Sequence, residues 1–203
     1  MKSKNKFSFG VLIVFIILLI FLRSDYRLIE KPICCGDDHD YFSHAESLVI
    51  DFDFDYTNQL DGFENKRFNQ NGKIAPKGFI GSGLFAAPFL YIGNLIDKLY
   101  SLIHQGNNNN IMNYKILLYS FSPIFYLFGS IELLKKTFTN VGIKINMYLV
   151  YLVMFGSGLS YFAFERYSMT HVYEVFGITL IFYISSIYKT KKEINNNLIV
   201  FMI

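Results

Sequence analysis

The sequence predicts an all-α integral membrane protein: a polytopic helix bundle with an outer-face loop that carries short amphipathic helices. Hydrophobic residues make up 52% of the 203 residues, and 22 Phe with 15 Tyr exceed what one water-soluble core of this length needs. Several apolar runs are about as long as a bilayer requires. Lys and Arg stand in short groups at the ends of these runs, and the net charge is only +3. A charge distribution without a basic patch argues against nucleic acid as a partner.

The first 22 residues predict an N-terminal transmembrane helix. Residues 7–22 are apolar and follow a flank that contains three lysines. The same pattern can begin a secretory signal, but a signal needs a small-residue cleavage site, and Arg23-Ser24-Asp25-Tyr26-Arg27 follows instead. An uncleaved anchor is therefore the favoured interpretation.

Three later apolar runs predict further membrane spans, at 116–134, 147–164 and 172–188. Residues 114–203 are therefore expected to form a transmembrane bundle. Residues 198–203 begin another apolar run and stop far short of a span, which predicts that the chain is the N-terminal piece of something longer. Such a piece is expected to lack part of the bundle at its C-terminus.

A fifth apolar run, at 79–96, decides the topology. If it crosses the membrane, the lysine groups near the chain start, at 135–144 and at 189–192 fall on different sides; if it is a re-entrant or interfacial helix, all three groups are cytoplasmic. The second interpretation is favoured, because glycines and a proline interrupt this run: Gly78, Gly81, Gly83, Pro88 and Gly93. It predicts an outer loop over 23–113 and a multi-pass protein of the plasma (inner) membrane with a cytoplasmic N-terminus.

Eleven of the 16 acidic residues lie between Asp25 and Glu64, within the predicted outer loop. The densest group contains Asp37, Asp38 and Asp40, and helical spacing of the apolar residues that follow places these aspartates at the start of a helix. One interpretation is a solvated acidic loop whose aspartates only cap that helix. The other is a carboxylate beside the membrane that accepts a proton from an attacking hydroxyl, as a general base does.

Metal binding is the weaker interpretation of the acidic loop. Asp51-Phe52-Asp53-Phe54-Asp55 has the DxD spacing that can hold a divalent cation, but this spacing is common in acidic loops. Asp40 and His44 stand four apart on a predicted helix, yet two ligands without a third do not make a metal site. The adjacent Cys34 and Cys35 match neither a redox pair nor a zinc set. No metal site and no cofactor are predicted.

Basic residues near the predicted outer surface could bind an anion. Lys77 stands at the start of a predicted helix, where a cation beside free N–H groups suits a phosphate, although a lysine that reaches to lipid headgroups is an equal alternative. The outer turn before the last span contains Arg166 and His171. Glu174 stands a few residues into that span, where a charge needs a cavity or a partner, and Arg166 or His171 is the expected partner.

The order of several motifs resembles the start of GT-C membrane glycosyltransferases, the group that includes protein O-mannosyltransferases and aminoarabinose transferases. An N-terminal span precedes Gly36-Asp37-Asp38-x-x-Tyr41, and Ala45-x-Ser47-Leu48 follows. Ala75-Pro76-Lys77-Gly78, with the run from Gly83 to Phe89, resembles the second outer motif of these enzymes. Ser168-Met169-Thr170-His171 resembles the segment that opens their next span. The likeness covers most of the chain in the right order.

The resemblance implies a polytopic enzyme that transfers a sugar from a polyprenyl-phosphate donor to an acceptor on the outer face of the membrane. The acid of the first outer loop is the catalytic base in such enzymes, which implies Asp37 as the leading candidate and Asp38 as its neighbour. Lys77, Arg166 and His171 would then contact the donor phosphate or the sugar. The expected partners are the lipid-linked donor and membrane lipid.

Two other classes of function stay open from the residues alone. A non-catalytic polytopic membrane subunit or small-molecule transporter is the main alternative, but a transporter should place paired charges in mid-span, whereas here the ionisable residues gather at the outer edge. The other class is an adhesive or scaffold anchor whose acidic loop binds Ca²⁺, which predicts calcium-dependent protection of residues 37–55.

Overall fold

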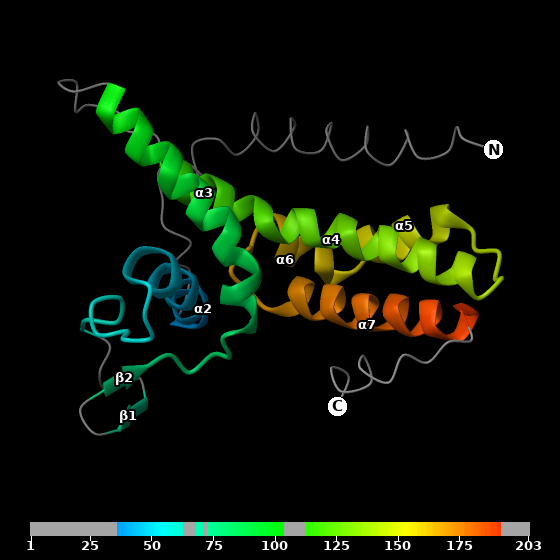
Figure 1. Ribbon diagram of the computed structural model, residues 1–203, viewed down its shortest axis with the longest axis horizontal. Coiled ribbons are helices and arrows are strands. Elements are labelled where there is room, and N and C mark those ends of the chain that lie inside the picture. The colour runs from blue at the N-terminus through cyan, green and yellow to red at the C-terminus, as the bar shows by residue number, and fades with distance from the viewer. Residues whose placement is uncertain (1–35, 63–67, 71–72, 104–112, 192–203) are drawn as a thin grey trace.

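The computed structural model describes residues 36–62, 68–70, 73–103 and 113–191. This part of the chain is mostly helical (Figure 1). The elements, in chain order, are α2 (Gly36–Glu46), the π-helical turn η1 (Ser47–Asp51), β1 (Phe68–Gln70), β2 (Lys73–Ala75), α3 (Gly81–Ile103), α4 (Tyr114–Asn140), α5 (Met147–Gly156), α6 (Gly158–Phe164) and α7 (His171–Lys191).

Two of these helices are long and apolar enough to cross a membrane: α4 and the stretch of α7 from His171 to Lys189. The pair α5 and α6 would be a third crossing if it is counted as one bent span. These helices contain the three runs predicted at 116–134, 147–164 and 172–188. The predicted N-terminal span at 7–22 and the two cysteines lie outside the described residues.

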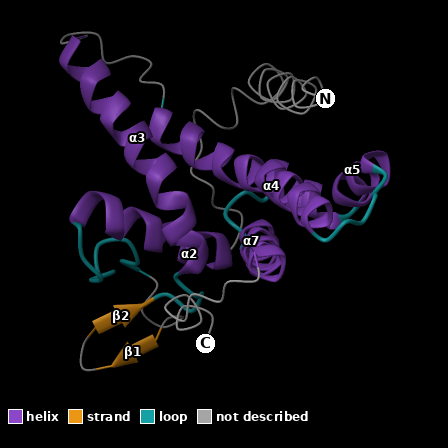
Figure 2. Ribbon diagram, turned by 45° about the vertical axis from the view of Figure 1, so that its right-hand side comes forward, coloured by secondary structure: helices purple, strands orange, loops and turns teal. Residues whose placement is uncertain are grey.

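Helices α4 and α7 lie side by side, and α3 covers α4 at one end before it extends away from both (Figures 1 and 2). Of the most apolar window of α4, 61% is buried within the protein, against 22% for α7. Helix α4 is therefore the central helix of this bundle. The name "α2 end" is used below for the end of α4 and α7 at which α2 packs.

The glycines of the 79–96 run were expected to interrupt the helix. They do not. Helix α3 is continuous from Gly81 to Ile103 and includes Pro88. Two of its glycines lie where another backbone approaches closely: a Cβ on Gly83 would lie 2.5 Å from the Cβ of His44, and one on Gly93 would lie 2.6 Å from the Cα of Lys115. The absence of a side chain is therefore needed for packing, and not for a bend.

Helices α5 and α6 form a bent arm, called the α5–α6 arm below. Their axes meet at 67° across Ser157, whose extended backbone (φ −93°, ψ 172°) ends the first helix. The Ser157 hydroxyl accepts a hydrogen bond from the Leu159 backbone N–H at 3.3 Å and so caps the second helix. The span predicted at 147–164 therefore consists of two helices with a bend between them.

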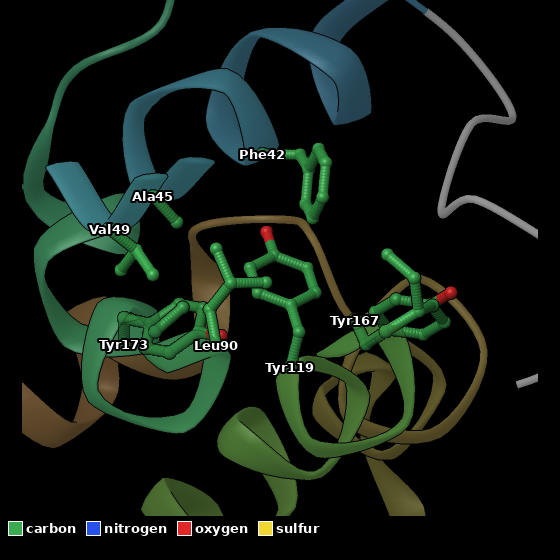
Figure 3. Packing of buried hydrophobic residues seen from close by; sticks show 9 residues of the cluster. Phe42, Ala45, Val49, Leu90, Tyr119, Tyr167 and Tyr173 are labelled. Carbon is green, nitrogen blue, oxygen red and sulfur yellow. The ribbon is translucent and has the colours of Figure 1, made fainter. Parts of the chain in front are cut away.

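The helix predicted to begin at the acidic group is α2, and its apolar side is buried in the protein. Phe42, Ala45 and Val49 pack against Leu90 of α3 and Tyr119 of α4 (Figure 3). The rings of Phe42 and Tyr119 meet edge to face at 5.0 Å. This core fixes the face of α2 that points to the bundle, so the aspartates of its first turn lie at the rim of that contact.

A short antiparallel hairpin of β1 and β2 follows the acidic loop, with Phe68 opposite Ala75 and Gln70 opposite Lys73. The sequence analysis did not predict it, although Asn71-Gly72 between the strands is a common hairpin dipeptide. Strand β2 leads directly into the segment 76–80 that precedes α3.

The start of α4 is fixed by α3. Both carboxylate oxygens of Asp97 accept hydrogen bonds, at 2.9 Å, from the backbone N–H groups of Tyr114 and Lys115. A carboxylate is well suited to the free N–H groups and positive dipole of a helix start. The Lys115 ammonium also forms an ion pair with Glu46 at 3.0 Å, which joins the end of α2 to the same point.

Candidate functional site

The two aspartates that begin α2 have different environments. Asp37 is exposed to solvent, whereas the side chain of Asp38 is only 3% exposed. An Asp38 carboxylate oxygen accepts a hydrogen bond from the guanidinium of Arg166 at 3.0 Å, and this ion pair joins residues 128 positions apart. Because a charge that is removed from water needs a partner, Asp38 and Arg166 depend on each other. Asp37 is the carboxylate that can meet a molecule from outside.

Asp40, one turn further along α2, holds the segment that contains Lys77. Its side chain is buried, and one carboxylate oxygen accepts a hydrogen bond from the Lys77 backbone N–H at 3.2 Å. The Lys77 residue itself is exposed. Residues three apart on a helix are neighbours, so the Lys77 backbone lies within about one helical turn of Asp37. Lys77 is therefore an exposed basic residue whose backbone is attached to α2 at Asp40.

The side chain of Tyr41 extends from α2 and lies against Gly78 and the turn before α7. A Cβ on Gly78 would lie 2.4 Å from a ring carbon of Tyr41, so only glycine fits there without movement. Burial, and then the negative charge of Asp37, raise the pKa of the Tyr41 hydroxyl above its ordinary value of 10.0, while a hydrogen bond with Thr170 opposes this shift. The hydroxyl therefore stays protonated at neutral pH and lies close to the Asp37 carboxylate.

The first turn of α7 brings further ionisable groups to the same rim. His171 and Glu174 form a long ion pair of 3.9 Å between exposed side chains, a pair that carries charge on both sides only when the histidine is protonated. Glu174 also acts on the Tyr41 hydroxyl through its negative charge. Of the two partners predicted for Glu174, His171 is the one that lies beside it, and Arg166 pairs with Asp38 instead.

The acidic loop after η1 binds its own backbone and neighbours. Asp53 accepts hydrogen bonds from the Ser47 hydroxyl and the Asp55 backbone N–H, both at 3.1 Å. Asp55 accepts two from Thr57, and these bonds lower the pKa of its carboxyl. Asp51 accepts bonds from the amides of Asn58 and Gln59. Within the described residues, no three His, Cys, Asp or Glu side chains are placed to hold a metal ion.

The structure brings together most of the residues that the sequence singled out, but with different roles. Asp37 and Asp38 lie in the first turn of α2, which Arg166 reaches through its ion pair, and the backbone of Lys77 contacts Asp40 one turn further along. The link between His171 and this group runs through Glu174. Asp40 and His44, considered as a metal pair, instead contact the Lys77 and Gly78 backbone separately.

Sequence reasoning missed Tyr41 and Thr170 as parts of this rim. Tyr41 stands four residues after Asp37, the spacing that places two side chains on one face of a helix, and this signal was available. Thr170 had no such signal in the sequence, because its contact depends on how α7 packs.

Comparison of the chain with protein-family models, with curated proteins and with solved structures gives no match.

Proposed function

We propose that the protein is a multi-pass membrane glycosyltransferase that transfers a sugar from a polyprenyl-phosphate donor to an acceptor on the outer face of the membrane. The proposal rests on the resemblance to GT-C enzymes and places a polytopic helix bundle in the plasma (inner) membrane with a cytoplasmic N-terminus. The apolar helices α4 and α7 support the membrane bundle, and the lysines in the last turns of α4 and just beyond it, at the end opposite to α2, support this orientation.

The observation that carries the proposal is the contrast between Asp37 and Asp38. A base must be ionised and open to its substrate, and Asp37 is exposed while Asp38 is buried against Arg166. The buried pair fixes the first turn of α2 to the turn before α7, so the free carboxylate is held on a rigid frame. Asp37 is therefore the proposed base, and Asp38 a positioning residue.

The proposed reaction assigns a step to each of these residues. The oxygen of an acceptor hydroxyl attacks the anomeric carbon of the donor sugar, and its proton passes to the Asp37 carboxylate. The bond from the anomeric carbon to the phosphate oxygen breaks, and polyprenyl phosphate leaves with the electron pair. Negative charge grows on the phosphate, where the exposed ammonium of Lys77 can stabilise it.

Arg166 and His171 take more limited parts in this proposal. The guanidinium of Arg166 already neutralises Asp38, so a contact with the donor would compete with that ion pair. His171 is exposed beside Glu174 and can donate a hydrogen bond to a sugar hydroxyl. Of these residues, Lys77 is the one expected to determine affinity for the phosphate.

The experiment is transfer of labelled sugars from polyprenyl-phosphate donors in membranes that contain the complete reading frame. Asp37→Asn removes the base while it keeps size and polarity, and we expect transfer to fall by about 10²–10⁴-fold, the usual contribution of a general base. Asp61→Asn is the matched control, because Asp61 is also an exposed aspartate of this region but lies in the loop after η1. Its transfer should equal that of the wild type.

Two results would contradict the proposal. Equal transfer by wild type and Asp37→Asn, at equal abundance in the membrane, would remove Asp37 from the mechanism. No transfer from any lipid-linked donor tested would favour the non-catalytic subunit or transporter instead.

A further inference from the structure

His44 joins three segments of the chain that are far apart in sequence. It lies in the last turn of α2 and is only 6% exposed. Its Nδ1 lies 2.9 Å from the Tyr56 hydroxyl, and its Nε2 lies 2.9 Å from the Gly78 carbonyl oxygen. A carbonyl only accepts hydrogen bonds, so Nε2 carries the proton, and in the neutral ring Nδ1 accepts from the Tyr56 hydroxyl.

The packing around the ring leaves little room for water. The ring of Tyr56 meets that of His44 edge to face at 5.1 Å, and Tyr56 itself is packed with Leu60 and Ile74. On the other side, α3 approaches so closely at Gly83 that a Cβ there would lie 3.0 Å from the backbone nitrogen of Ala45. The ring is therefore held between the Tyr56 hydroxyl and the Gly78 carbonyl, and α3 packs against the backbone of the same turn of α2.

We propose that His44 is a pH-sensitive latch, which in its neutral form holds the loop around Tyr56 and the segment 76–83 against α2 and releases them when it gains a second proton. A second proton places a positive charge in a site shielded from water. It also changes Nδ1 from acceptor to donor, so the Tyr56 hydroxyl must turn from donor to acceptor. Both changes weaken the neutral arrangement.

The groups that face His44 decide how strongly the second proton is resisted. Two groups favour the charged ring: the Gly78 carbonyl, from the segment before α3, and the buried carboxylate of Asp40, from α2. Tyr56 faces the ring as a neutral phenol, and Gly83 of α3 adds no charge. Burial outweighs them and lowers the pKa of His44 below its ordinary value of 6.5. Stability from the latch is therefore full above about pH 6.5 and is lost as the pH falls through the lowered pKa.

The latch also controls where Lys77 lies. Lys77 is held to α2 by the bond from its backbone N–H to Asp40, next to the Gly78 carbonyl that His44 holds. Release of Gly78 therefore loosens the attachment of Lys77 to the first turns of α2. This inference does not depend on glycosyl transfer, because the attachment can be measured directly.

The test uses the full chain in lipid nanodiscs, with isotope-labelled histidine and amide hydrogen exchange measured from pH 7.5 to pH 4.5. His44 should titrate with a midpoint below 6.5. Protection of amides 77–83, corrected for the intrinsic pH dependence of exchange, should fall over the same range by up to about tenfold per pH unit, the limit for one linked proton. Amides of α4 should not follow this titration.

Two variants distinguish the latch from a passive buried histidine. His44→Gln can still donate to the Gly78 carbonyl but does not titrate, so its protection of 77–83 should be independent of pH. Tyr56→Phe removes the donor that favours the neutral ring, so the transition should move to higher pH. The latch proposal is contradicted if His44 titrates without any change in the amide protection of residues 77–83. It is also contradicted if Tyr56→Phe does not change the pH of the transition.

Discussion

The α2 end of the bundle and the α5–α6 arm are attached in different ways. At the α2 end, polar contacts such as the ion pair of Asp38 with Arg166 join segments far apart in sequence, and each contact has a required direction. In α5, only Met154 is buried, while Leu152 and Val153 are 68% and 67% exposed. Directional contacts allow only one placement of α2. The α5–α6 arm packs through apolar side chains, which allow small changes in its position. The α2 end should therefore be sensitive to small changes that the arm tolerates.

Loss of the buried ion pair should have the largest effect of the changes considered. Arg166→Ala removes the guanidinium that pairs with the Asp38 carboxylate, 3% exposed, and removal of one partner of a buried pair costs about 3–5 kcal/mol. The free energy of unfolding, measured by SDS titration of the protein in mild-detergent micelles, should fall by that order. A double variant with Asp38→Asn should recover part of the loss, and equal losses in the single and double variants would mean that the pair is not coupled.

Close backbone approach at the α2 end gives the next effect. Gly93→Ala places a Cβ 2.6 Å from both the Cα of Lys115 and the carbonyl oxygen of Tyr114, and backbone atoms cannot move aside singly. We expect a loss of about 1–3 kcal/mol, the usual cost of overpacking, in the same SDS titration. Gly81→Ala is the control on the same helix, because it has no neighbour within 4 Å. A loss at Gly81 as large as at Gly93 would contradict this interpretation.

The arm should show the smallest effect. Gly156→Ala adds a methyl group where there is no neighbour within 4 Å, at the last residue of α5. Alanine is the better helix former by about 0.5–1 kcal/mol, so the unfolding free energy should stay the same or rise slightly. A loss comparable to that of Gly93→Ala would show that the arm is packed as tightly as the α2 end, and the contrast between the two regions would fail.

The apolar runs predicted the helices of the described bundle but not their lengths or breaks. Hydropathy detects the apolar part of a helix, so it could not show that α4 continues through Lys135 and Lys136 to Asn140. The break in the arm was marked by Gly156-Ser157-Gly158, a signal that was present and not used. The glycines of α3 were given the wrong physical reason, because a sequence does not show which backbone approaches them.

The candidate site was predictable in its residues and not in its arrangement. Asp37, Asp38 and Arg166 were all singled out, but nothing local to the sequence pairs Asp38 with a guanidinium 128 residues away. Such a pairing depends on how α2 packs against the turn before α7. For the same reason, the bond between Asp40 and the backbone of Lys77 could not be predicted from a search for side-chain charges.

The capping of α4 by Asp97 has a practical consequence for studies of membrane sidedness. Because Asp97 and Gly93 position the first turn of α4 directly on α3, we expect that position to be kept when residues are inserted at 104–112. An epitope or protease site inserted among these residues, which include four consecutive asparagines, should leave the helix pair undisturbed. The connection between α3 and α4 is thus a suitable place for a reporter that shows which compartment the α2 end faces.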